Sequence, residues 1–226
     1  TPQIDTPHSR RRVSLADYEF ADLIDQQDKV RLLIDPTSSY AQAAAYAMGR
    51  AMDDVIISAA TGTAFTGETG SGTETAQTAI AANVGSTTGL NIDKLLKAKE
   101  KFDLASVDPS IQRYIVVGPE QMSNLLGTTQ VTSSDFNSVK ALVQGEVDTF
   151  LGFKFITSNR LAKAGNDRTC IAFAQDGITL AVGKDVSARI DERADKSYAT
   201  QVYYCMSIGA TRMEKEKVIG ITCTEA

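Results

Sequence analysis

The sequence predicts an α+β fold, from three observations taken along the chain. Apolar residues recur at steps of three and four between Ser39 and Ala60, which indicates one long amphipathic helix. Shorter helical and strand patterns are mixed between Asn91 and Ala174. From Lys184 onward, apolar and polar residues alternate with a period of two, which is typical of an antiparallel sheet with one exposed face. A long helix, a mixed block and then strands together indicate the α+β class.

The helix predicted over 39–60 is the element around which the rest is arranged. Pro36 precedes it and Gly62 follows it, so both ends carry ordinary helix start and stop signals. Its predicted buried face consists of Ala41, Ala44, Ala45, Met48, Met52, Val55, Ile56 and Ala59. We therefore expect another element to approach the helix backbone closely, and Ala45→Glu to destabilise the fold. A transmembrane helix is not predicted, because charged residues interrupt any run of the roughly 18 apolar residues that a span needs.

Composition indicates a globular protein with an acidic balance. The chain has 226 residues, of which 28 are acidic and 23 are basic, so the net charge is −5. This balance argues against a protein that binds nucleic acid over a wide surface. Cys170, Cys205 and Cys223 lie far apart and form no Cys-x-x-Cys motif, so we expect neither a disulfide framework nor a zinc site. A reducing compartment fits this cysteine usage.

Two blocks of opposite charge lie close together near the N-terminus. The basic block is Arg10, Arg11 and Arg12, and the acidic residues that follow are Asp17, Glu19, Asp22, Asp25 and Asp28. One hypothesis is that these blocks contact something outside the local fold. The alternative is an ordinary solvated charged surface.

The segment 62–88 is rich in glycine and threonine and predicts a long surface loop. Within it, Gly67–Gly72 has the glycine content of a phosphate-binding loop, but no Gly-Lys-Ser/Thr sequence follows. A nucleotide site is therefore not expected here.

The block after this loop mixes short helices and strands. Asn91 is a predicted N-cap for a helix that ends at Phe102, with Lys94, Lys97 and Lys101 on its expected exposed side. Further helices are predicted over 118–127 and 138–144, and strands over 114–117, 153–157 and 169–174. The apolar segment 175–182 is ambiguous between helix and strand. Strands at 186–190, 202–210 and 218–224 are then expected to form one antiparallel sheet.

The sequence offers no arrangement of residues that is typical of catalysis, a metal or a cofactor. His8 is the only histidine and lies in the terminal segment, so a Ser-His-Asp triad is not expected, and no Gly-x-Ser-x-Gly motif exists. The acidic clusters at 17–28 and 191–195 lack the ligand order of an EF-hand. A carboxylate pair for glycoside hydrolysis stays possible, although the chain has no tryptophan to stack a sugar. We therefore predict a protein that contacts other proteins.

Several short motifs, in this order, resemble the central region of tailed-phage major capsid proteins. They are Asp25-Gln26-Gln27-Asp28, Asp35-Pro36, Tyr40, Gly49-Arg50-Ala51-Met52-Asp53-Asp54, Ile56 to Gly62, Phe150 to Leu161, and Val218 to Thr224. The resemblance covers nearly the whole chain, and its strength lies in the order of these motifs.

This resemblance implies the HK97-type coat fold. Such a fold has a long spine helix, an antiparallel peripheral sheet and an α/β axial domain. By position, residues 1–34 would be an N-terminal arm and the end of the E-loop, 35–88 the spine helix and loop of the peripheral domain, 89–183 the axial domain, and 184–226 the returning peripheral strands. Because only residues 1–34 precede the spine, we expect a longer gene product, and we expect this chain alone to be a monomer or small oligomer.

The function implied by the resemblance is structural, without enzyme activity or cofactor. The chain would form pentamers and hexamers of an icosahedral shell around the double-stranded DNA of a tailed phage, assembled in the host bacterial cytoplasm. Scaffolding, portal or decoration proteins are the other partners expected, with only weak DNA contact and no membrane. Candidate inter-subunit contacts are Arg10, Arg11, Arg12, Asp17, Glu19, Asp25 and Asp28. The alternatives are an encapsulin-like cellular compartment and a carboxylate-dependent hydrolase.

Overall fold

The computed structural model describes residues 9–25, 37–85, 87–127 and 149–225. These residues belong to two compact units. Unit 1 consists of Thr1–Arg12, Ile57–Thr179 and Thr211–Ala226, and unit 2 of Val13–Ile56 and Leu180–Ala210. None of the described helices is long and apolar enough to cross a membrane.

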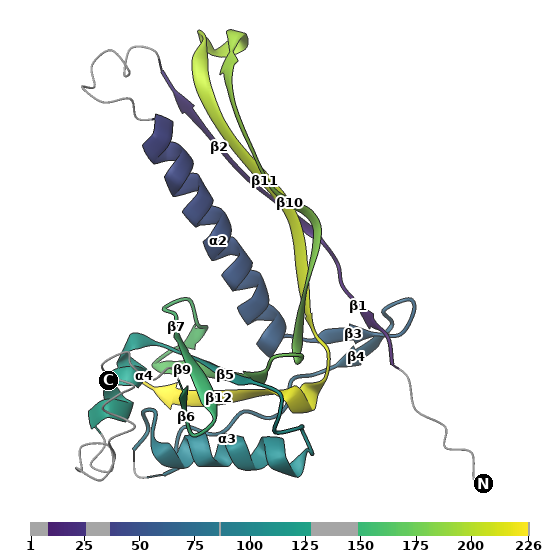
Figure 1. Ribbon diagram of the computed structural model, residues 1–226, viewed down its shortest axis with the longest axis vertical. Coiled ribbons are helices and arrows are strands. Elements are labelled where there is room, and N and C mark those ends of the chain that lie inside the picture. The colour runs from purple at the N-terminus through teal and green to yellow at the C-terminus, as the bar shows by residue number, and fades with distance from the viewer. Residues whose placement is uncertain (1–8, 26–36, 86, 128–148, 226) are drawn as a thin grey trace. The chain divides into compact units, whose positions relative to one another are not determined.

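Unit 2 combines most of the long helix with a three-stranded sheet (Figure 1). The helix is α2 (Thr37–Thr61), and it is the longest of the described helices, as predicted. The strand order is β10 (Ile178–Arg193), β11 (Ala199–Arg212) and β2 (Ala16–Ile24), and β11 pairs antiparallel with β2. A short 3-10 helix, Ala194–Lys196, lies between β10 and β11. The period-two pattern of 186–210 therefore forms strands, as expected.

The buried face of α2 includes fewer residues than the apolar pattern in the sequence predicts. Met48 packs with Met206 and Ile208 of β11, and Ala44 is completely buried. Ala45, one position further around the helix, is exposed. The prediction that Ala45 lies in the packed face is therefore wrong, because the apolar stripe of the sequence is wider than the contact that the sheet makes.

The described part of unit 1 is built on a six-stranded sheet. The strand order is β12 (Val218–Thr224), β9 (Asp167–Ala174), β5 (Arg113–Val117), β7 (Phe153–Thr157) and β6 (Thr149–Phe150), and β8 (Lys163–Ala164) also pairs with β9. β5 and β7 run parallel, and the other pairs are antiparallel. The expectation of a single C-terminal sheet is wrong for β12, which pairs with β9 instead of β11. A short 3-10 helix, Lys215–Lys217, directly precedes β12.

Helices α3 (Ile92–Leu104) and α4 (Pro119–Gly127) contribute apolar side chains to the core of unit 1, together with Ala60 at the end of α2. In Figure 1, α3 runs along β12. Leu95 and Phe102 of α3 are fully buried, and the ring of Phe102 lies 6.1 Å from that of Phe153. Asn91 caps α3 as predicted, because its side chain accepts a 2.9 Å hydrogen bond from the backbone N–H of Lys94.

Lys94 was predicted to lie on the exposed side of α3, and this prediction is wrong. Lys94 is fully buried, and its ammonium group donates to the carbonyls of Thr88, Gly89 and Thr222 at 2.7, 2.7 and 3.1 Å. Burial lowers the pKa of this lysine. Three acceptors match the three ammonium donors, and this explains how a cation can be buried here.

The segment 62–88 contains regular structure that the sequence did not predict. β3 (Ala64–Thr66) pairs with β4 (Gly72–Glu74) and with β1 (Arg11–Arg12), so the three form a small sheet. Further on, Ile80 is buried and forms a bridge to Ile221 in β12. Gly67 and Gly70 lie in the turn between β3 and β4 and have φ of 83° and 72°. The predicted helix over 138–144 falls outside the described residues.

Candidate functional site: an arginine junction

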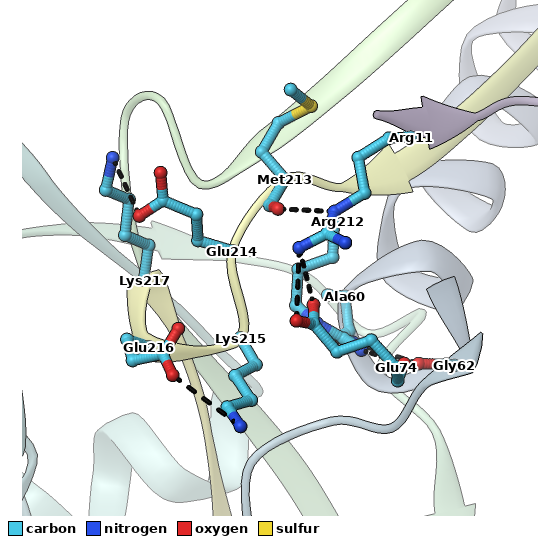
Figure 2. A network of polar contacts seen from close by, with 10 residues as sticks. All are labelled: Arg11, Ala60, Gly62, Glu74, Arg212, Met213, Glu214, Lys215, Glu216 and Lys217. Carbon is cyan, nitrogen blue, oxygen red and sulfur yellow. Dashed lines mark hydrogen bonds and ion pairs between the residues drawn. The ribbon is translucent and has the colours of Figure 1, made fainter. Parts of the chain in front are cut away.

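Unit 1 contains an arginine junction formed by Arg11, Glu74 and Arg212 (Figure 2). Arg11 comes from β1, Glu74 from β4 and Arg212 from the end of β11. The site therefore joins three segments that are far apart in the sequence.

Arg212 satisfies backbone carbonyls where α2 ends. The last carbonyls of a helix have no partner within the helix. Nη1 of Arg212 donates to the carbonyls of Ala60 and Gly62 at 3.0 and 2.9 Å, and Nη2 donates to the carbonyl of Glu74 at 2.9 Å. A cation at this position also interacts favourably with the helix dipole. Arg212 thus attaches the C-terminal end of α2 to β4.

Arg11 attaches strand β1 to Glu74 of β4 and to Met213, which directly follows Arg212. Its Nη2 donates to both carboxylate oxygens of Glu74 at 3.1 and 3.0 Å, and its Nε donates to the carbonyl of Met213 at 2.6 Å. The Arg11 side chain is only 8% exposed. β1 is only two residues long, so these contacts add to the few hydrogen bonds that its pairing with β3 provides.

The junction places two guanidinium groups near one carboxylate. Arg212 is completely buried, and burial lowers the pKa of its guanidinium, while the charge of Glu74 raises it. An arginine keeps its charge in spite of such a shift. Because every charged group here is either positive or already paired, the arrangement fastens segments together and offers neither a general base nor a metal ligand set.

The other two arginines of the basic block also contact the hairpin of β3 and β4. Arg12 donates to the carbonyl of Thr69 at 2.7 Å, and Arg10 lies 4.0 Å from Glu68 with both side chains strongly exposed. The structure thus brings Arg10, Arg11 and Arg12 together on one hairpin.

The acidic candidates lie in unit 2. Asp17 and Glu19 are exposed residues of β2, and Glu19 accepts a 3.0 Å hydrogen bond from the hydroxyl of Tyr203. Asp25 is exposed just after the end of β2, and Asp28 lies outside the described residues. An inter-subunit role stays a prediction for all seven candidates.

A second charged cluster surrounds Glu225, and the sequence did not predict it. The Glu225 carboxylate pairs with Arg168 of β9 and with Lys163 of β8, the latter at 2.5 Å, and it accepts a 3.0 Å hydrogen bond from Gln121 of α4. These contacts, led by the one to Arg168, hold the pKa of Glu225 at about 2. The cluster thereby fixes the end of the described chain to β9 and α4.

The alternating residue pattern of β11 contained a signal for the arginine junction. Val202, Met206 and Ile208 occupy the buried phase of β11, and Arg212 continues that phase as a buried charged residue. A charge at an expected core position indicates a partner. The partners themselves are mostly backbone carbonyls, which no residue pattern reveals.

The family model described as phage capsid protein matches residues 1–225. The chain belongs to the phage capsid protein family. Among solved structures, the capsid of the cyanophage P-SCSP1u has a TM-score of 0.70 at 17% identity, over 96% of this chain and 74% of that one. The capsid of Ralstonia phage GP4 has a TM-score of 0.69 at 10% identity, with the same coverage. A Mycobacterium phage Che8 structure reaches 0.62 at 20% identity, over 91% of this chain and 70% of that one. No curated protein matches the chain by sequence.

These findings confirm the predicted HK97-type coat fold and α+β class. The capsid protein is a structural component of the virion and not an enzyme. The encapsulin-like alternative is not favoured, because the family and the structural relatives are phage capsids.

Proposed function

We propose that this major capsid protein assembles through copies of itself into pentamers and hexamers of an icosahedral shell that encloses the double-stranded DNA of a tailed phage. The observation that carries the proposal is the family match over 1–225. Assembly takes place in the host bacterial cytoplasm, with scaffolding, portal or decoration proteins as further partners. The net charge of −5 suits a wall that contacts packaged DNA only weakly.

In this proposal, residues 1–34 form the arm and the end of the E-loop, and residues 35–88 and 184–226 form the peripheral domain of the subunit. Residues 89–183 form the axial domain. Rings of five and six need heterologous contacts, in which different surfaces of adjacent subunits meet. Exposed charges can select the partner surface while each contact stays weak. The described candidates that are exposed are Arg10, Arg12, Asp17, Glu19 and Asp25.

The arginine junction supports this role from inside the subunit. A neighbour that binds the N-terminal segment pulls on β1, which pairs with β3 through only two residue positions. Arg11 links β1 to Glu74 and to the carbonyl of Met213, and Arg212 links β4 to the end of α2. The junction would therefore transmit a force on the N-terminal segment to the C-terminal end of α2.

The proposal is tested by expressing the gene product that contains this chain and examining purified material by electron microscopy and light scattering. Closed shells of uniform diameter are expected. Material that stays monomeric under conditions where related coats assemble would contradict the proposal. Particles that contain a protein cargo and lack DNA, detected by the ratio of absorbance of nucleic acid to protein, would favour the encapsulin-like alternative.

The contribution of the exposed charges is tested with Arg10→Glu. We expect fewer particles and a weaker dependence of assembly on salt, because exposed ion pairs are screened. Lys97→Glu, which changes an exposed lysine on α3, is the matched control and should leave assembly unchanged. Equal assembly of both variants at all salt concentrations would argue against Arg10 as a contact.

A further inference from the structure

A cysteine, a lysine and a serine meet on the sheet of unit 2. The Sγ of Cys205 in β11 lies 3.0 Å from the Nζ of Lys184 and 3.0 Å from the Oγ of Ser187, both in β10. Cys205 is 9% exposed and Lys184 is exposed, so small solutes can reach the pair.

Groups from all three strands surround the thiol. Besides Lys184 and Ser187, Tyr203 is close to it in β11, and Glu19 of β2 is the residue paired with Cys205 across the sheet. The Tyr203 hydroxyl donates to Glu19, which directs that carboxylate toward the tyrosine. Hydrogen bonds from Ser187 and then from Lys184 lower the pKa of Cys205. The reactive thiolate form is therefore favoured.

A second lysine and cysteine in the same chain provide a contrast. Lys94 Nζ lies 4.0 Å from Cys223 Sγ, but both residues are completely buried. The ammonium of Lys94 already donates to three carbonyls. By comparison, Lys184 is exposed, and its closest described partner is the sulfur itself.

We propose that Cys205 and Lys184 form a covalent sulfur–nitrogen cross-link when a peroxide oxidises the cysteine. In the first step, the thiolate displaces hydroxide from hydrogen peroxide, so that sulfur is oxidised to a sulfenic acid and the peroxide is reduced. In the second step, the unprotonated amine of Lys184 attacks the sulfenic sulfur. A sulfur–nitrogen bond forms, the sulfur–oxygen bond breaks, and one water leaves. The net change is the loss of two hydrogen atoms from the protein, and a thiol reductant restores both side chains.

The cross-link has a structural consequence because it joins neighbouring strands of one sheet. β10 and β11 lie side by side, and the two linked residues are 21 positions apart in the chain. Closing a loop of this kind reduces the freedom of the unfolded chain. Unit 2 of a particle exposed to peroxide would thus be held in its folded arrangement.

The test treats the chain with hydrogen peroxide and measures intact mass and proteolytic peptides. A mass loss of about 2 Da, with a peptide that joins Lys184 to Cys205 and separates on reduction, is the expected result. Lys184→Arg keeps the positive charge but removes the amine, so Cys205 should instead gain about 16 or 32 Da as sulfenic or sulfinic acid. Cys205→Ser should show neither change.

The pair Lys94 and Cys223 serves as the control within the same digest and should stay unmodified. A wild-type Cys205 that gains oxygen without joining to Lys184 would overturn the proposal. So would a cross-link that retains oxygen, seen as a gain of about 14 Da, or a cross-link formed equally at Lys94 and Cys223.

Discussion

The two units bury apolar side chains to very different extents. The core of unit 1 draws on β5, β6, β7, β9 and β12 and on helices α3 and α4. The core cluster of unit 2 consists of Met48, Met206 and Ile208, with partly buried neighbours around them. Unit 2 also exposes large apolar side chains on β10, including Val182 and Ile190 at 50% each. We therefore expect unit 1 to be stable by itself and unit 2 to gain stability from other subunits in a shell.

The largest difference is expected from core substitutions in the two units. Phe153→Ala should destabilise unit 1 by about 3–5 kcal/mol, because Phe153 is fully buried against Phe102. Met206→Ala should lower the free energy of unfolding by about 2 kcal/mol, which is the low end for such changes. The residues around Met206 are partly exposed and can fill the cavity more easily. Denaturant unfolding measures both values. Phe65→Ala, at a site that is 47% exposed, is the control, and a larger cost for Met206→Ala than for Phe153→Ala would reverse the comparison.

The arginine junction gives the next prediction. Arg212→Met should destabilise unit 1 by about 3 kcal/mol, because the buried carbonyl of Ala60 and the partly buried carbonyls of Gly62 and Glu74 would lose their donor. Arg189→Met, which removes an exposed arginine from unit 2, should change the melting temperature little. Similar melting temperatures for the two variants would show that the junction does not hold unit 1 together.

A smaller effect is expected from pH in unit 1. The folded pKa of Glu225 is about 2, below its ordinary value of 4.5, so its contribution to stability is fully present above pH 4.5 and is lost as pH falls through about 2. Between about pH 2 and pH 4.5, Glu225→Gln should weaken the pH dependence of the free energy of unfolding. Near neutral pH, the pH dependence of the variant should match that of the wild type. Unfolding curves of both proteins across this window measure the effect. An identical acid dependence in the variant would mean that Glu225 is not the group responsible.

The smallest effect is expected at the exposed edge of the long helix. Ala45→Glu should change stability by less than about 0.5 kcal/mol, because Ala45 is exposed. Ala44→Glu should be strongly destabilising, because Ala44 is completely buried and the new carboxylate would have no partner. Thermal unfolding of the pair decides which side of α2 faces the sheet, and a severe loss for Ala45→Glu would place the contact on the other side.

Much of the fold could be predicted because local patterns and tertiary packing agree. Asn91 caps α3, and the strand at 113–117 forms as its apolar run indicated. The partner of β12 could not be predicted, because alternation defines a strand but not its neighbour. Lys94 was misplaced for a related reason: three backbone carbonyls stabilise it, and those acceptors have no signature in the sequence.

The site was harder to predict than the fold. Arg10, Arg11 and Arg12 stood out as a charged block, but their contacts with the hairpin of β3 and β4 depend on a turn that the sequence indicated only as a loop. Arg212 and Glu225 were missed because their partners are distant in sequence, at separations of 152 and 57 residues. Single charged residues carry no periodic signal, so only the three-dimensional arrangement reveals them.

The contrast between the units is tested most directly by hydrogen exchange, measured by mass spectrometry on the free chain and on assembled shells. We expect slow exchange of β5 and β9 in the free chain, because these strands lie inside the larger core. We expect faster exchange of β10 and β11 in the free chain and clear protection of both after assembly. Equal protection of β9 and β10 in the free chain, with no change on assembly, would show that the two units do not differ in this way.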